Sequence, residues 1–264
     1  MTNILSQSPT EIAIKRLRDI EPDDGYILAF SGGKDSIVIK RLADLAGVKY
    51  TAYYSVTTID PPELVWFIRK HHKDVHFSRP KKTFLQMLVK KKMPPYRHTR
   101  WCCDKLKEGL DKRLGISCTI ITGIRREESS RRAQRLVYEP KKVGAVKSRP
   151  VWFLNPIIDW DSEEVWTFVR REKLPYCSLY DEGFKRLGCI MCPMSNNQNR
   201  EAERWPRYRE LFEKAFIKVF NAKVAEGHKD FTSGRWRDGK HYFEWWLDYR
   251  QKAYKKEQVT MDIW

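Results

Sequence analysis

Six consecutive residues, Ser31-Gly32-Gly33-Lys34-Asp35-Ser36, have the composition of a phosphate-binding loop. Glycines let the backbone approach an anion closely and adopt positive φ angles. A helix that begins directly after the loop adds unpaired N–H groups and the positive end of its dipole. Lys34 adds a charge, and Ser31 and Ser36 add hydroxyl donors. We therefore expect a pyrophosphate site, although it is not the GxxxxGK[ST] loop, in which more residues precede the lysine. The alternative is a glycine turn that only caps a helix.

Four of the six cysteines form a second set of residues that could bind a metal or carry out redox chemistry. Cys102 and Cys103 are adjacent, and Cys189 and Cys192 form a CxxC pair. If the fold brings them together, four thiolates suit a [4Fe-4S] cluster or, alternatively, a zinc ion. Reduced, partly buried cysteines or a CxxC redox pair alone are the other interpretations. The two remaining cysteines are expected to be structural.

The elements around these residues alternate between strand and helix. An apolar run at residues 26–30 precedes the loop, and an amphipathic segment at residues 37–47 follows it. We expect further strands at residues 50–56, 75–77 and 119–122, and helices at residues 9–20, 63–72, 81–92, 103–114, 162–172 and 201–226. Residues 129–150 are polar and basic and are expected to form a loop. This order predicts an α/β fold in which helices flank a parallel sheet.

The composition favours an anionic partner. Lysine and arginine exceed aspartate and glutamate by 51 − 34 = 17 in 264 residues. Nucleic acid is the first candidate, whereas the alternative is a solvated basic surface that only steers an anionic nucleotide. No uncharged apolar run approaches the length of a membrane span, and the N-terminus does not look like a signal peptide. We therefore expect a cytoplasmic protein without a membrane partner.

The loop and several later motifs carry a resemblance to known families. SGGKDS, at residues 31–36, resembles the signature of the PP-loop ATP pyrophosphatases, or adenine nucleotide α-hydrolases. Four further stretches resemble motifs of the sulfonucleotide reductases. They are YRHTRWCCDKLK at 96–107, GIRREES at 123–129, NPIIDW at 155–160 and LPYCSLYDEGFKRLGC at 174–189. The resemblance to the phosphoadenosine phosphosulfate (PAPS) reductase family runs from about residue 25 to residue 200.

The resemblance implies an adenine nucleotide α-hydrolase-like, Rossmann-like fold that binds ATP with Mg²⁺. In such proteins the loop binds the β- and γ-phosphates, and the reaction occurs at the α-phosphate. The expected catalytic residues are Lys34, Asp35 and Arg125. The expected nucleotide-binding residues are Ser31, Gly32, Gly33, Lys34, Asp35, Ser36, Asp60, Gly123 and Arg125, of which Asp60 is equally open to a purely surface role. Cys102, Cys103, Cys189 and Cys192 match the [4Fe-4S] ligands of the branch that reduces adenosine phosphosulfate (APS).

One departure from the reductases concerns the C-terminal part. We expect a nucleotide-binding domain at residues 1–200 and a helical, basic, tryptophan-rich extension at residues 201–264. The reductases carry a nucleophilic cysteine in a tail motif, whereas no cysteine follows Cys192 here. The tail suits base stacking and phosphate contacts, or equally the packing of helices around a core.

Three functions follow as hypotheses. The first is an ATP-using enzyme that transfers sulfur to nucleic acid, as in DNA phosphorothioation systems, with a cysteine desulfurase as the sulfur donor. The second is a PAPS or APS reductase with a diverged tail. The third is a non-catalytic nucleotide-binding subunit of a larger complex. The sequence leaves open whether the chain forms a homodimer.

Overall fold

The computed structural model describes residues 7–141 and 150–248. The described chain forms two compact units, each assembled from separate stretches of sequence. The first, here called the sheet unit, comprises Met1–Val56, Pro62–Arg79 and Glu108–Leu187. The second, the helical unit, comprises Thr57–Pro61, Pro80–Lys107 and Gly188–Trp264. The expected domain boundary after residue 200 stays a prediction.

A six-stranded sheet forms the centre of the sheet unit, in the order β3-β2-β1-β4-β6-β5. Its strands are β1 Tyr26–Ala29, β2 Tyr50–Ser55, β3 His76–Ser78, β4 Cys118–Ile121, β5 Tyr138–Pro140 and β6 Val151–Leu154. Neighbouring strands pair in parallel, except that β5 runs antiparallel to β6 at one edge. The four strands expected from the sequence are confirmed to within one or two residues, and so is the α/β fold class.

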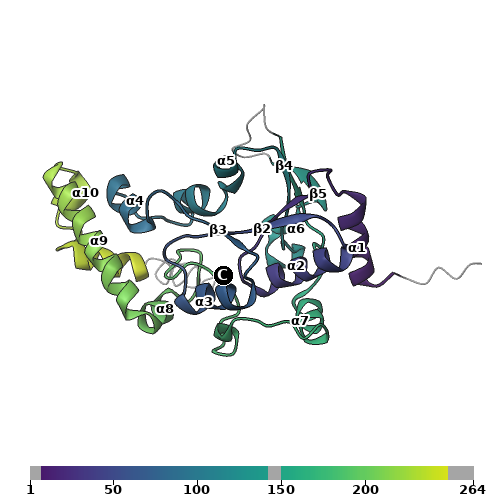
Figure 1. Ribbon diagram of the computed structural model, residues 1–264. Helices are drawn as coiled ribbons and strands as arrows, with labels where there is room; N and C mark the ends of the chain where they lie inside the picture. The colour runs from purple at the N-terminus through teal and green to yellow at the C-terminus, as the bar shows by residue number, and fades with distance from the viewer. Residues whose placement is uncertain (1–6, 142–149, 249–264) are drawn as a thin grey trace, which may run out of the picture. The chain divides into compact units, whose positions relative to one another are not determined.

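Helices cover both faces of the sheet (Figure 1). They are α1 Pro9–Asp19, α2 Lys34–Ala46, α3 Pro62–His71, α5 Leu110–Leu114, α6 Ser130–Ala133 and α7 Ser162–Arg171, with short 3₁₀ turns η2 Arg126–Glu128 and η3 Ser178–Tyr180. Helix α2 packs against both α1 and α7. Figure 1 shows α5 on the other side of the sheet from α2 and α3.

The pleat of the strands explains why both faces need cover. Ile27 of β1 and Ile120 of β4 are register partners, so their side chains lie on the same face. Leu110 of α5 buries this face together with Val151 of β6. Leu28, next to Ile27 in β1, is fully buried on the opposite face, because successive side chains of a strand alternate. A strand buried on both sides reads as a continuous apolar run.

The helical unit contains α4 Phe84–Lys91, a π-helical turn η1 Cys103–Lys107, α8 Gln198–Arg204, α9 Pro206–Ala225 and α10 Lys229–Thr232, followed by a helix at residues 239–248. Aromatic side chains make its core. Phe216 of α9 lies 5.2 Å from the ring of Phe243 and 5.2 Å from that of Trp246, and Phe212 lies 5.3 Å from Phe84 of α4. Trp246, expected to stack or to pack, is buried in this core.

Three expectations about local structure are wrong. The helix predicted at residues 201–226 is broken between α8 and α9, because Pro206 lacks an N–H and disfavours helical backbone at Trp205. The helix predicted at residues 103–114 is two elements, η1 and α5, with Gly109 as the N-cap of α5. The loop predicted at residues 129–150 contains α6 and β5, and β6 was not predicted.

Within the described residues, none of the helices combines the length and the apolar character that crossing a membrane requires.

The close approach of two helices in the helical unit can be tested at Gly239. A Cβ atom there would lie far inside van der Waals contact with the backbone Cα atom of Ile217 in α9. The higher helix propensity of alanine is worth only ~1 kcal/mol. We expect Gly239→Ala to destabilise the protein by about 1–3 kcal/mol in urea unfolding, because overpacking outweighs that gain. Gly188→Ala, where a Cβ would meet nothing within 4 Å, is the control. Equal stability of both variants would contradict the close approach.

Candidate functional site

The six-residue loop connects the end of β1 to the start of α2 in the sheet unit. Gly33 is the N-cap of α2, and a glycine has no side chain with which to cap the helix. Ser31 and Ser36 hold the loop from within, because the hydroxyl of Ser36 donates to the carbonyl of Gly33 at 2.8 Å and Ser31 Oγ accepts from the N–H of Gly33 at 3.3 Å. The first turn of a 13-residue helix is therefore presented at the end of a central strand.

Gly32 is the position at which the loop requires glycine. Its φ of 73° lies in the left-handed region. A Cβ atom there would stand 2.7 Å from Cδ1 of Leu64 and 2.8 Å from Cδ1 of Ile68, both on α3. Since both the conformation and the space exclude a side chain, the backbone of the loop is pressed against α3.

The three predicted catalytic residues come together beside this loop. The Lys34 ammonium lies 3.1 Å from Asp35 Oδ1, and Arg125 Nε donates to the same oxygen at 2.7 Å. Arg125 Nη1 donates to Glu127 at 2.6 Å. Burial is the largest single influence on the pKa of Arg125 and lowers it, but the charge and hydrogen bond of Asp35, together with Glu127 and Glu128, outweigh burial and raise the pKa. Lys34, Asp35, Arg125 and Glu127 thus form a chain of ion pairs in which two positive charges are balanced by two negative ones.

Gly123 also lies where the sequence predicts, against the loop. A Cβ atom at Gly123 would meet the Cβ of Asp35 at 3.0 Å and its backbone oxygen at 3.1 Å. The strand that ends before Gly123, β4, is the neighbour of β1 in the sheet. Because parallel strands end at the same edge, the segment after β4 reaches the loop after β1.

Tyr180 is a member of this site that the sequence analysis did not single out. Its hydroxyl accepts a hydrogen bond from the N–H of Lys34 at 2.9 Å. Burial raises the pKa of Tyr180, so the phenol keeps its proton and can donate it to a further acceptor. The ring is held edge-on against Trp166, with centroids 5.0 Å apart. Tyr180 lies in the motif at residues 174–189, which was a usable signal, but no local pattern links it to Lys34.

Asp60 was predicted to bind nucleotide, but its surroundings are those of the helical unit. Its buried carboxylate accepts from the N–H of Thr57 at 2.8 Å, from the Thr57 hydroxyl at 2.7 Å and from the N–H of Thr58 at 3.2 Å. Thr58 has a φ of 68°, which is unusual for a residue other than glycine. The observed contacts of the Asp60 carboxylate therefore stabilise this turn, and its role toward nucleotide stays a prediction.

All four predicted metal ligands belong to the helical unit. Cys103 begins η1 and Cys102 directly precedes it, while Cys189 and Cys192 lie in the loop before α8. A hydrogen bond with Cys103 is the largest influence that raises the pKa of Cys102, and Cys189 and Cys192 add to it. The four thiols are thus electrostatic neighbours. Among the described residues, however, no three cysteine, histidine or carboxylate side chains are arranged to hold a metal ion.

Neighbouring groups fix the CxxC loop and influence its thiols. Glu201 of α8 accepts from the N–H of Met191 at 2.6 Å, and Met191 has a φ of 53°. Burial raises the pKa of Cys189 to about 11, and the Lys107 ammonium opposes that shift. In return, the nearby Cys189 raises the pKa of Lys107. Lys107 was not singled out as a site residue, although its position four residues after Cys103 was a usable signal.

The two cysteines expected to be structural lie in the sheet unit. Cys177 is 1% exposed, and Cys118 is half-buried at the start of β4. Burial raises the pKa of Cys118 to about 11, so its thiol is neutral at ordinary pH.

Comparisons with known proteins agree with this geometry. An uncharacterised protein of Methanocaldococcus jannaschii is 31% identical over 236 residues, which are 85% of this chain and 54% of that protein, so the chain spans about half of that relative. The adenosine 5′-phosphosulfate reductase of Pseudomonas aeruginosa (strain LESB58) is 30% identical over 219 residues, covering 77% of this chain and 79% of the reductase.

Structural similarity points to the same fold. The crystal structure of phosphoadenylyl-sulfate reductase from Candida auris, in complex with phosphate, superposes with a TM-score of 0.53 at 19% identity and covers 71% of this chain and 90% of that one. The superposition agrees with the expected fold, a central sheet with flanking helices. The phosphoadenosine phosphosulfate reductase domain matches residues 25–195, a span that includes the loop, the Arg125 segment and all four clustered cysteines. On this match, supported by the fold, the chain belongs to the phosphoadenosine phosphosulfate reductase family.

Proposed function

We propose that this protein binds ATP with Mg²⁺ at the loop of residues 31–36 and uses it to activate an acceptor for sulfur transfer to nucleic acid. The observation that carries the proposal is the start of α2, where the N-cap is a glycine with no side chain to cap the first turn and where the cations of Lys34 and Arg125 lie beside the loop. Anions are stabilised at such a helix end by unpaired N–H groups and by the dipole. A triphosphate supplies that anion.

The charges beside the loop support chemistry at the phosphates. Lys34 is 5% exposed and Arg125 is 4% exposed, so both cations act in surroundings that screen charge weakly. They would stabilise negative charge that develops on the phosphates when the α–β anhydride bond breaks. Asp35 lies between them, and a carboxylate there suits Mg²⁺ bound jointly by protein and phosphate oxygens.

The proposed reaction has two steps. An oxygen of the acceptor forms a bond to the α-phosphorus, and the bond from that phosphorus to the bridging oxygen breaks, so that pyrophosphate leaves. A sulfur nucleophile from the donor protein then attacks the activated atom of the acceptor, and AMP leaves with the original oxygen. The cationic surface of the chain, with a formal net charge of +17, suits a nucleic acid as that acceptor.

We further propose that Cys102, Cys103, Cys189 and Cys192 hold a [4Fe-4S] cluster. Each thiolate of such a cluster binds a different iron atom, so the thiols surround the group, whereas a zinc ion requires them to converge on one point. The mutual electrostatic influence of the four thiols supports a shared four-thiolate site. A bound cluster would supply iron with high affinity for sulfur.

Reduction of a sulfonucleotide is the second candidate. The similarity to the Pseudomonas aeruginosa reductase, at 30% identity over 79% of that protein, favours it. Sulfite formed from APS or PAPS with thioredoxin, in the absence of pyrophosphate release from ATP, would establish the reductase in place of sulfur transfer.

Lys34 tests the use of ATP. We expect Lys34→Met to lower nucleic-acid-stimulated pyrophosphate release by about 10²–10³-fold, because a charge that stabilises the transition state is lost. The same variant should bind ATP more weakly in calorimetry. Lys15→Met is the control, since Lys15 is exposed on α1 and pairs with Asp19 at 2.7 Å. ATP binding without turnover in the wild-type protein would overturn the catalytic proposal.

Tyr180 tests how the phosphate is held. The ring is clamped by Trp166 and bonded to the N–H of Lys34, so we expect its hydroxyl to stay in place and donate to a phosphate oxygen. Tyr180→Phe should weaken ATP binding by about three- to tenfold, the value of one ordinary hydrogen bond. Tyr176→Phe is the matched control, because Tyr176 is in the same aromatic cluster but bonds to Asp181. Tighter binding by Tyr180→Phe would show instead that the hydroxyl competes with phosphate.

The cysteine assignment can be tested apart from any activity. Protein purified without oxygen should be brown and contain iron and acid-labile sulfide in equal amounts. We expect Cys189→Ser to lose most of both, because a cluster ligand is removed. Cys118→Ser, in a strand of the sheet unit, should retain them. Zinc without labile sulfide in the wild-type protein would overturn the cluster.

A further inference from the structure

Helix α3 has two faces of opposite character. Leu64, Phe67 and Ile68 are buried in the sheet unit, and Leu64 and Ile68 form the wall against which Gly32 packs. The other face is exposed and carries aromatic and basic side chains. One helix therefore supports the nucleotide loop on one side and presents a surface to a partner on the other.

The exposed face is an ordered stripe. Trp66, Arg69, Lys70 and Lys73 are spaced at i, i+3, i+4 and i+7, so they line one side of the helix and its immediate continuation. Trp66 is 60% exposed, and the Lys70 ammonium lies 4.6 Å from the centre of its ring. We call these four residues, together with Arg79, the α3 stripe.

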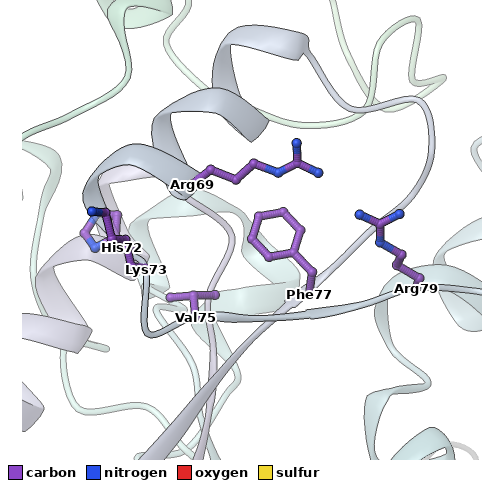
Figure 2. Close-up of a pocket in the computed structure, with 6 residues that line it drawn as sticks. All are labelled: Arg69, His72, Lys73, Val75, Phe77 and Arg79. Carbon is purple, nitrogen blue, oxygen red and sulfur yellow. The ribbon is translucent and has the colours of Figure 1, made fainter.

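The stripe continues into a hollow at the edge strand β3, with a volume of about 330 Å³. Arg69, His72, Lys73, Val75, Phe77 and Arg79 line it. Figure 2 shows Arg69, from the helix, and Arg79, after the strand, turned toward the space beside Phe77. The Arg69 guanidinium lies 5.5 Å from the centre of the Phe77 ring.

The charged side chains that line the hollow are cationic. None of the described residues that line it is acidic. The nearest carboxylate in sequence, Asp74, is paired with Lys40 at 2.9 Å. Burial lowers the pKa of His72 to about 4, so this imidazole is neutral and the positive charge comes from Arg69, Lys73 and Arg79.

From this arrangement we infer that the α3 stripe binds a single-stranded segment of nucleic acid. Its cations contact backbone phosphates, and Trp66 stacks on an unpaired base. An exposed indole beside cations suits a base that is free of a duplex, because a paired base offers no open face. The inference rests on the proposed function only for the identity of the acceptor. A strand held here would lie about one helix diameter, roughly 10–12 Å, from the nucleotide loop.

The cations are tested by the salt dependence of binding. Fluorescence anisotropy with a labelled single strand of about 16 nucleotides covers the site size of such surfaces. We expect the double variant Arg69→Gln, Lys73→Gln to lower the slope of log K against log[salt] by about 1.4, since each phosphate contact on a single strand contributes ~0.7. The double variant Lys214→Gln, Lys218→Gln removes the same charge from exposed positions of α9 and should keep the wild-type slope.

Trp66 tests the stacking. Trp66→Ala should weaken binding of the single strand by roughly five- to a hundredfold, the value of one stack of a base on an aromatic ring. Trp66→Phe should retain most of the affinity, because a flat ring remains. The exposed position makes both variants compatible with folding, which circular dichroism verifies.

Three further results would overturn the inference. The first is an equal loss of affinity for the single strand in the stripe variant and in the α9 control, because binding would then follow total charge alone. The second is a duplex bound as tightly as the single strand and insensitive to Trp66→Ala, and the third is phosphatidylserine vesicles bound through the stripe while the strand is not. Pyrophosphate release is measured separately. If the strand binds but no pyrophosphate is released, only the proposed function is contradicted. If pyrophosphate is released but the stripe variants bind the strand as the wild type does, only the inference about the α3 stripe is contradicted.

Discussion

The start of helix α2 is the constraint on which the site depends. A helix leaves its first N–H groups without intrahelical partners, and a side chain at the N-cap usually satisfies one of them. Here the N-cap is Gly33, and the hydroxyl of Tyr180 takes the N–H of Lys34. The N–H groups in the first turn of α2 therefore depend on polar groups from outside the helix. A helix start of this kind is a favourable site for an anion.

Packing against α3 makes this arrangement rigid. Gly32 combines a φ of 73° with contacts that leave no room for a side chain. A loop held in this way does not need to be ordered by its ligand, so less conformational entropy is lost on binding. The salt bridges of Asp35 with Lys34 and Arg125 likewise keep two buried cations in place before any phosphate arrives. Buried charges left unpaired would be far more costly.

The cysteines are organised by a different part of the molecule. Segments far apart in sequence make the helical unit, and α8 fixes the CxxC loop through Glu201. Phe84, Phe212 and Phe216 give this unit an aromatic core of its own. The nucleotide loop and the thiols thus depend on separate sets of packing contacts, and a change in one core need not disturb the other site directly.

The sequence by itself determined what depends on neighbours along the chain. The loop, the strand before it and the helix after it could be predicted, because apolar periodicity and glycine conformation are local properties. The family resemblance grouped Arg125 with Lys34 and Asp35 as expected catalytic residues, and the structure shows that Arg125 bonds to Asp35. Short elements at residues 130–154 escaped prediction, because their pairing partners lie in distant strands and their own pattern is weak.

Only the tertiary structure decided which groups meet across long separations. The contact of Tyr180 with Lys34, the turn closed by Asp60 and the two faces of α3 all arise from packing between distant segments. The sequence of such a segment does not indicate which distant residue its side chains will contact, since the same tyrosine or carboxylate would fit many surroundings. Their roles become visible when the fold fixes distance and burial, which are properties of the whole chain.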